Sequence, residues 1–297
     1  MKHTVTVSAP AKLNLYLDVT GKRGDGYHNI ESVMQSIELC DIVTVTVDTE
    51  EKSDRVTITC TDPSIPCTSE NICVKAVGEF YKYYGDEHYG VDIHIEKNIP
   101  VGAGMGGGSA DAAAVAVALN RALNTFLDSE ELCNIAANIG ADVPFCVVGK
   151  TQYCTETGDM LRQLSHIPDC IFVVGKGRES VSTAEAYKDI DNAEKLMTED
   201  VAAVFCSEDI NVIAGNCRNI FEQTVKLPEV TEIKDIISQS GALCSCMTGS
   251  GSAVFGIFTD ADSAAACEGT LRNMGYYAVK ALPSRMGVRV LSAETAE

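Results

Sequence analysis

The sequence is poor in positive charge. Its 297 residues contain 23 Lys and Arg against 42 Asp and Glu, which gives a formal net charge of −19 at pH 7. A protein that wraps a phosphate backbone needs a basic surface, because much of its affinity comes from releasing the counterions of the nucleic acid. The charge balance therefore excludes a nucleic-acid partner of that kind, although a local group of donors can still hold a small anion.

Long apolar runs are also missing. No uninterrupted stretch approaches the roughly 20 apolar residues that a membrane-spanning helix requires, and residues 1–7 lack the apolar core of a signal peptide. We therefore expect a soluble, cytoplasmic protein without a membrane partner.

The 13 cysteines lack the spacing of a metal site or a redox motif. No C-x-x-C pair occurs, and the closest two, Cys244 and Cys246, have no second pair and no histidine nearby. Most of the others lie in apolar segments. We expect reduced thiols that pack as small buried side chains.

Alternating apolar residues predict strands through the first hundred residues. Period-two patterning is typical of half-buried strands, and it recurs in residues 13–19, 43–47, 56–58 and 91–95. One helix is expected among these strands, with Ser69 as its N-cap and Gly85 just past its end.

Helices and strands then mix without strict alternation. Helices are expected at about 109–123 and at 128–140, the second beginning with a capping-box spacing; residues 182–240 are compatible with further helices, and residues 262–274 with another. Strands are expected at 171–174, 253–258 and 288–291. This mixture indicates an α+β protein, and the length suggests two domains, 1–157 and 158–297.

A glycine-rich segment carries the strongest local signal. Residues 100–112 read Pro-Val-Gly-Ala-Gly-Met-Gly-Gly-Gly-Ser-Ala-Asp-Ala, between an expected strand and an expected helix. Glycines let backbone N–H groups turn toward a ligand, and a helix N-terminus adds partial positive charge. A phosphate chain fits this combination better than the alternative of a simple flexible connector.

Three common phosphate motifs do not account for this segment. Gly102, Gly104 and Gly107 satisfy G-x-G-x-x-G, but the acid about 20 residues on, Asp128, has the context of a helix cap. A Walker loop ending at residues 149–151 lacks its first glycine, because Pro144 stands there. The protein-kinase signatures H-R-D and D-F-G are missing.

The segment resembles instead the ATP loop of the GHMP kinases, the galactokinase, homoserine, mevalonate and phosphomevalonate kinase superfamily. Two more segments are similar to the same superfamily: residues 8–15, Ser-Ala-Pro-Ala-Lys-Leu-Asn-Leu, and residues 247–255, Met-Thr-Gly-Ser-Gly-Ser-Ala-Val-Phe. The resemblance implies an α+β, two-domain GHMP kinase fold with the active site in the cleft between the domains. It also implies ATP and Mg²⁺ as cofactors and a small-molecule alcohol as substrate.

Finer features resemble one family within that superfamily, the 4-diphosphocytidyl-2-C-methyl-D-erythritol kinases. They are residues 21–28 (Gly-Lys-Arg-Gly-Asp-Gly-Tyr-His), 31–36, 140–145 (Gly-Ala-Asp-Val-Pro-Phe) and 181–187 (Val-Ser-Thr-Ala-Glu-Ala-Tyr). The family implies transfer of the γ-phosphoryl group of ATP to the 2-hydroxyl of a cytidine diphosphate sugar-alcohol, in isoprenoid precursor synthesis. Met105, Ala110 and Lys150 depart from the residues common in the family.

The resemblance also assigns roles to individual residues. Asp142 would take the proton from the substrate hydroxyl, and Lys12 would keep that carboxylate ionised and stabilise the transferring phosphoryl group. Tyr27 and Tyr187 would sandwich the cytosine ring, and polar contacts from His28 would select cytosine. Ser109 is a candidate for phosphate or Mg²⁺ contact as well as for a helix cap.

Further candidates come from the same motifs. The expected ATP-binding residues are Pro100, Val101, Gly102, Ala103, Gly104, Met105, Gly106, Gly107, Gly108, Ser109, Ala110, Asn71, Ile72, Lys75 and Lys97. The expected substrate-binding residues are Asn14, Tyr27, His28, Thr183, Tyr187, Gly249, Ser250, Gly251 and Ser252.

Two other functions remain open from the sequence. One is a related GHMP kinase for a smaller alcohol, which the set of Tyr27, His28 and Tyr187 disfavours. The other is a nucleotide-binding regulator without turnover, which would need neither Lys12 nor Asp142. The oligomeric state, monomer or homodimer, is not determined.

Overall fold

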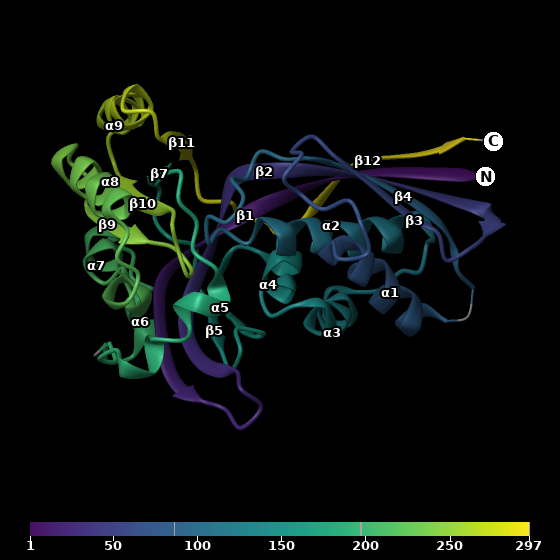
Figure 1. Cartoon of the computed structure of the whole chain (residues 1–297), viewed down its shortest axis with the longest axis horizontal. Coiled ribbons are helices and arrows are strands. Elements are labelled where there is room, and N and C mark those ends of the chain that lie inside the picture. The colour runs from purple at the N-terminus through teal and green to yellow at the C-terminus, as the bar shows by residue number, and fades with distance from the viewer. Residues whose placement is uncertain (86, 197, 297) are drawn as a thin grey trace.

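Two β-sheets lie toward the two ends of an elongated molecule (Figure 1). The computed structural model describes residues 1–85, 87–196 and 198–296. Both termini lie at the same end, beside the first sheet. None of the helices in these described ranges is long and apolar enough to cross a membrane.

Two long strands form the centre of the first sheet. Strands β1 (Lys2–Lys22) and β2 (His28–Lys52) pair antiparallel along most of their length. The sheet continues in the order β12-β1-β2-β4-β3, with β3 at Val56–Cys60, β4 at Tyr89–Glu96 and β12 at Arg289–Ala296. The strand pattern expected at residues 13–19 is therefore part of one longer strand, whose pairing with β2 is interrupted by three register shifts.

Helices cover one face of this sheet. They are α1 (Ile72–Tyr84), α2 (Gly107–Ala122), α3 (Ser129–Ile139) and the short α4 (Val143–Val148). Alanines fill the buried side of α2, and their small side chains let the helix lie close to β1 and β2. The capping box predicted for α3 is confirmed, but the N-cap of α1 is Asn71 and not Ser69, because the Asn71 side chain accepts the Cys73 N–H at 2.9 Å.

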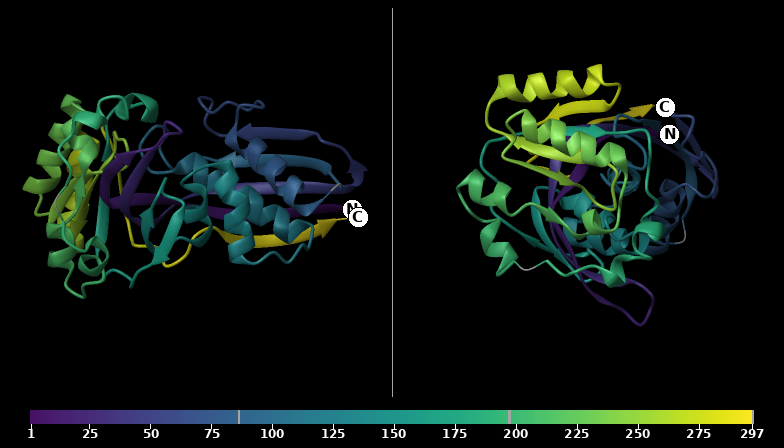
Figure 2. Two further views of the ribbon diagram at one scale, coloured as in Figure 1. Left: turned by 90° about the horizontal axis from the view of Figure 1, so that it is seen from below. Right: turned by 60° about the vertical axis from the view of Figure 1, so that its left-hand side comes forward.

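The second sheet is antiparallel, in the order β11-β7-β10-β9. Its strands are β7 (Ile171–Lys176), β9 (Cys244–Met247), β10 (Val254–Phe258) and β11 (Tyr277–Ala281). Helices α8 (Pro228–Gln239) and α9 (Ala261–Asn273) cover one face. The opposite face packs against α6 (Val201–Val204), α7 (Ile210–Gly215) and apolar residues of β1 and β2 (Figure 2).

Short elements connect the two sheets. A hairpin of β5 (Thr151–Thr155) and β6 (Met160–Gln163) extends β2, and β8 (Arg218–Asn219) pairs with β1. Helix α5 (Thr183–Ala186) and the 3₁₀ turns η1 (Ile190–Asn192) and η2 (Ile220–Gln223) complete this region. The boundary expected at residues 157 and 158 falls inside the β5–β6 turn, so the chain leaves the first sheet only after Gln163, and β12 later returns to it.

The cysteines are unpaired, as predicted. All except Cys67 and Cys206 are buried or half-buried. Burial raises the pKa of the Cys133 thiol to about 11, which is the behaviour of a packed and unreactive thiol.

Candidate active site

The first glycine loop joins β4 to α2, and its backbone conformation requires glycine at three positions. Gly102, Gly104 and Gly106 have φ angles of 63°, 73° and 69°, a left-handed conformation that favours residues without a Cβ. Gly106 precedes the first residue of α2, so the loop runs directly into a helix N-terminus. Ser109 is the third residue of α2 and not its N-cap, and its hydroxyl has no hydrogen-bond partner among the described residues.

A second glycine loop, residues 248–253 between β9 and β10, packs directly against the first. The Ala253 N–H donates to the Ala103 carbonyl at 3.2 Å. A Cβ placed on Gly104 would lie 2.3 Å from the Thr248 carbonyl oxygen, and a Cβ on Gly249 would lie 2.5 Å from the Gly104 carbonyl oxygen. Backbone contacts this close are available only to glycine, so these two glycines set the distance between the loops.

Polar side chains hold the second loop in place. Asn219, in β8, donates to the carbonyls of Met247 at 2.7 Å and Gly249 at 2.8 Å. The hydroxyls of Thr183 and Ser250 lie 3.1 Å apart, which connects α5 to the loop. Asn219 was not among the predicted residues, because its role depends on partners almost thirty positions away.

Lys12 and Asp142 meet beside both loops. Lys12 lies on β1, where its N–H donates to the Met105 carbonyl at 3.0 Å, and its side chain is only 5% exposed. Its Nζ lies 3.6 Å from Oδ2 of Asp142, which stands just before α4 and is 31% exposed. The site thus pairs a buried cation with a carboxylate that solvent and a substrate can reach.

Asn14 holds the lysine in this position. Its Oδ1 accepts from Lys12 Nζ at 2.5 Å, and its Nδ2 donates to the Ser32 hydroxyl at 2.9 Å. The Asn14 backbone N–H donates to the Thr248 hydroxyl at 2.9 Å. Asn14 therefore links Lys12 to the second loop.

Two of the three predicted base-binding residues, His28 and Tyr187, contact each other near the hairpin between β1 and β2. The rings of His28 and Tyr187 stack, with centroids 5.0 Å apart and planes 28° apart, and Tyr187 also meets Phe221 edge-on. Burial, with a smaller contribution from the nearby Asp142 carboxylate, raises the pKa of Tyr187 to about 12. Tyr27 is 66% exposed.

Asp191, in η1, is a neighbour of His28 that no sequence motif predicts. His28 Nε2 lies 2.8 Å from its Oδ1, and Lys22 Nζ lies 2.5 Å from its Oδ2. These partners lower the pKa of the Asp191 carboxyl. An ionised carboxylate is an acceptor only, so this contact makes Nε2 the protonated nitrogen of His28 and leaves Nδ1 as the acceptor in a neutral ring.

Lys97 is enclosed behind the start of α2. Its Nζ donates to Asp41 at 2.5 Å and to Asp111 at 2.8 Å, and all three side chains are buried. Burial, opposed by Lys97 and reinforced by Asp41, raises the pKa of Asp111 to about 7. A Cβ on Gly107 would lie 3.1 Å from the Lys97 Nζ, so this charged cluster supports the base of the loop.

The remaining predicted residues on the ATP side have mainly structural contacts. Asn71 caps α1 and also donates to the Pro66 carbonyl, while Lys75 donates to the Ile139 carbonyl at the end of α3. Ile72 is the nearest neighbour of a Cβ placed on Gly108, at 3.7 Å. Ser252 donates to the Glu179 carbonyl at 2.5 Å. Their contacts with a nucleotide or substrate stay predictions.

Comparisons with known proteins agree with this architecture. Residues 71–150 match the model of the GHMP kinases N terminal domain, and residues 184–276 match that of the GHMP kinases C terminal domain. A protein of Clostridium botulinum named 4-diphosphocytidyl-2-C-methyl-D-erythritol kinase is 38% identical over 89% of this chain and 94% of its own length. One of Syntrophomonas wolfei with the same name is 40% identical over 89% and 93%. The chain belongs to this kinase family.

Solved structures of GHMP kinases have the same fold as this chain. A crystal structure of 4-(cytidine 5'-diphospho)-2C-methyl-D-erythritol kinase matches with a TM-score of 0.75 and 30% identity, over 94% of this chain and 99% of that one. A homoserine kinase from Cytophaga hutchinsonii has the same TM-score at 18% identity, over 97% of each chain, and this likeness shows the fold alone. The family and the α+β GHMP kinase fold predicted from the motifs are confirmed.

Proposed function

We propose that this family member transfers the γ-phosphoryl group of ATP to the 2-hydroxyl of 4-diphosphocytidyl-2-C-methyl-D-erythritol, in the non-mevalonate route to isoprenoid precursors. The observation that carries the proposal is the Lys12–Asp142 pair, 3.6 Å apart, beside two interlocked glycine loops. Relatives of this name match nearly the whole chain. ATP supplies the phosphoryl group, and the reaction takes place in the cytoplasm.

Asp142 and Lys12 have different roles at the substrate oxygen that attacks the γ-phosphorus. Asp142 accepts the proton of the substrate hydroxyl, which makes the oxygen nucleophilic as it approaches the γ-phosphorus. Lys12 pairs with the Asp142 carboxylate and contributes positive charge where the phosphoryl group passes. Because the Lys12 ammonium is buried and held by Asn14, little reorganisation is needed when charge develops.

The first glycine loop holds the nucleotide phosphates. Gly102, Gly104 and Gly106 leave room for backbone N–H groups to approach phosphate oxygens, and the N-terminus of α2 adds to the attraction. The Gly249–Ser252 segment holds the phosphates of the substrate on the other side of the junction.

Magnesium fits the donors that are present. Among the described residues no group of three or more acidic, histidine or cysteine ligands forms a metal cage. Mg²⁺ bound with nucleotides usually needs only one or two protein ligands beside phosphates and water. The Ser109 hydroxyl, in the first turn of α2, would supply one such ligand, and the ion would neutralise phosphate charge.

The base is read by the cluster around His28. Tyr187 is held by its stack with His28 and its edge contact with Phe221, and the exposed Tyr27 can close over the base. With Nε2–H directed at Asp191, the Nδ1 acceptor of His28 suits the exocyclic amine of cytosine and disfavours the carbonyl oxygen that uracil carries at the same position. Thr183 adds a polar contact from α5.

An ADP-release assay tests the proposal. The enzyme is given ATP and Mg²⁺ with the cytidine substrate, with its uridine counterpart, and with base-free alcohols such as homoserine and mevalonate. We expect efficient turnover of the cytidine compound alone. Equal turnover of a base-free alcohol would favour another GHMP kinase activity, and no turnover of any alcohol despite ATP binding would favour a regulator.

A further inference from the structure

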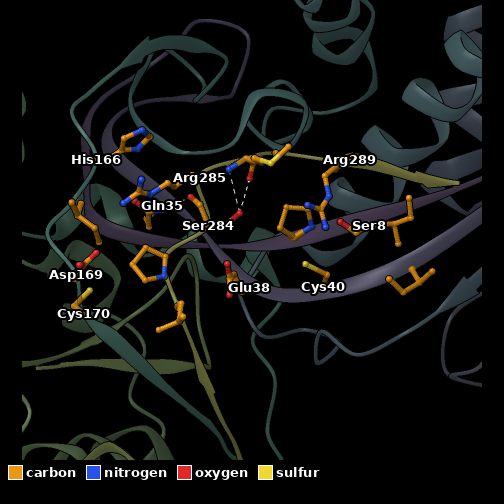
Figure 3. A pocket seen from close by; sticks show the side chains of 18 residues that line it. Ser8, Gln35, Glu38, Cys40, His166, Asp169, Cys170, Ser284, Arg285 and Arg289 are labelled. Atoms are coloured by element: carbon orange, nitrogen blue, oxygen red, sulfur yellow. Dashed lines mark hydrogen bonds between the residues drawn. The ribbon is translucent and has the colours of Figure 1, made fainter. Parts of the chain in front are cut away.

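A large cavity lies outside the candidate active site. Its volume is about 750 Å³, within the range of small-molecule sites. None of its lining residues belongs to the glycine loops, the Lys12–Asp142 pair or the base cluster. It is formed by β1 and β2, by the connection from β6 to β7, and by residues 282–291, which run from the end of β11 into β12 (Figure 3).

Hydrogen bonds within the protein hold the wall of the cavity in place without a ligand. Gln35, which is almost fully buried, donates to the carbonyls of Ser36 at 2.7 Å and Ser284 at 3.1 Å. The Ser36 hydroxyl donates to the Met286 carbonyl at 3.1 Å, and the Ser284 N–H donates to the Ser36 carbonyl at 2.7 Å. These bonds fix residues 284–286 against β2, so a ligand would meet an ordered surface.

Positive side chains face this space without partners. Arg285 and Arg289 both line the cavity, and neither guanidinium forms an ion pair or hydrogen bond with any of the described residues. Figure 3 shows Arg285 near His166 at one end and Arg289 beside Ser8 at the other. Two carboxylates, Glu38 and Asp169, line the same cavity, but neither forms an ion pair with Arg285 or Arg289, so both guanidinium groups are free to bind an anion.

Apolar side chains line the same cavity. Leu282, Met286 and Leu291 are each about half exposed, although side chains of this size usually lose most of their contact with water. Two free guanidinium groups together with an apolar wall suit a molecule that has carbon between two anionic groups.

The cavity wall also contacts the helix that follows the candidate base. The Val288 N–H donates to the Cys146 carbonyl at 2.9 Å, and a Cβ on Gly287 would lie 2.4 Å from the Val147 carbonyl oxygen. Both partners belong to α4, whose six residues begin next to Asp142. A shift of residues 285–289 would therefore press on the helix that positions Asp142.

We propose that this cavity binds a small organic bisphosphate, with one phosphate at Arg285 and His166 and the other at Arg289, and that its occupancy lowers turnover through α4. Arginine forks suit phosphate oxygens. Displacing Asp142 from its place beside Lys12 would slow proton transfer, which depends on close alignment.

Arginine side-chain NMR measures binding without relying on activity. The Nε–Hε signals of Arg285 and Arg289 are assigned by substitution and followed during titration with hexane-1,6-diol bisphosphate and with inorganic phosphate. No candidate active-site residue is an arginine, so phosphate bound at the glycine loops is not expected to move these two signals directly. We expect both to shift, with the bisphosphate at least about ten-fold tighter than inorganic phosphate.

Matched variants distinguish a specific binding site from a nonspecific effect of positive charge. Arg285→Gln and Arg289→Gln should each weaken the bisphosphate at least about ten-fold. Arg162→Gln, which removes an arginine that lies over the Tyr153 ring outside the cavity, should leave binding unchanged. Signals that do not move at about 10 mM ligand, or equal weakening in all three variants, would overturn the site.

Two further measurements fix the role of the cavity. Saturating bisphosphate should lower kcat about five-fold or more in the parent and not in Arg285→Gln; binding with unchanged kcat would overturn the link to α4. Sedimentation velocity tests the competing occupant, a second copy of the chain. A dimer that both arginine variants convert to monomer would make the cavity wall a subunit contact and overturn the ligand proposal.

Discussion

Gly104→Ala should disrupt the junction between the two glycine loops. The new Cβ would lie 2.3 Å from the Thr248 carbonyl oxygen and 3.1 Å from the backbone of Gly251, so one backbone segment must move by about 1 Å to reach ordinary contact. The φ angle of 73° adds a cost of about 1–2 kcal/mol for any residue with a Cβ. Overpacking costs a further 1–3 kcal/mol, roughly. We expect the free energy of unfolding to fall by about 2–5 kcal/mol in total.

Gly108→Ala is the matched control in the same loop-to-helix segment. Its Cβ would meet only Ile72, at 3.7 Å, in a helix where alanine is favoured over glycine by about 0.5–1 kcal/mol. Urea unfolding of both variants, with ATP and substrate titrations of the folded proteins, measures the difference. Stability and both affinities equal to the parent in Gly104→Ala, or an equal loss in Gly108→Ala, would refute the reasoning about the junction.

Variants at three other positions test the charged cluster and the base site. Asp111→Asn should change the free energy of unfolding more favourably near pH 8 than near pH 5, because burial raises the pKa of the Asp111 carboxyl to about 7 and its ionisation at rising pH destabilises the parent fold; urea unfolding that shows the same change at both pH values would contradict this. Tyr187→Ala should weaken substrate binding by about 1–3 kcal/mol, whereas Tyr187→Phe should be nearly silent, since the hydroxyl has no partner among the described residues; calorimetry with the cytidine substrate distinguishes the two. Asp191→Ala should reduce the ratio of kcat/KM between cytidine and uridine substrates, and Asp191→Asn should keep it, because the amide oxygen can still accept from His28. A ratio that is equal in the parent and both variants would show that Asp191 does not orient His28.

Local patterns predicted the parts of the fold that depend on neighbouring residues. The helix at Ser129–Ile139 follows from its capping box, whose residues contact one another within three positions. The helix at Ile72–Tyr84 was placed two residues early, because Ser69 has the chemistry of a cap but Asn71 makes the contact. The length of β1 was missed, because its register shifts interrupt the alternation that indicates a strand.

Contacts between residues far apart in the chain could not be predicted from sequence patterns. The order of the glycine motifs identified the family, but the packing of Gly104 on Thr248 joins residues 144 positions apart. Asp191 contacts His28 across 163 positions, and no spacing rule connects them. Lys97 was predicted on the nucleotide side, yet its two buried carboxylate partners depend on the pairing of β2 with β4 and the placement of α2. Sequence patterns thus indicated which residues take part, while tertiary packing determines how they are oriented.

The Lys12 and Asp142 double-mutant cycle tests the central claim most directly. Single variants Lys12→Met and Asp142→Asn and the double variant are compared by kcat/KM for the cytidine substrate, after circular dichroism shows that each is folded. Residues that act as one unit lose their effect together, so we expect each single change to cost roughly 100-fold or more and the double variant to be little worse than the poorer single one. Losses that multiply in full, or a folded Asp142→Asn variant with parental turnover, would contradict the account of a base and cation acting together.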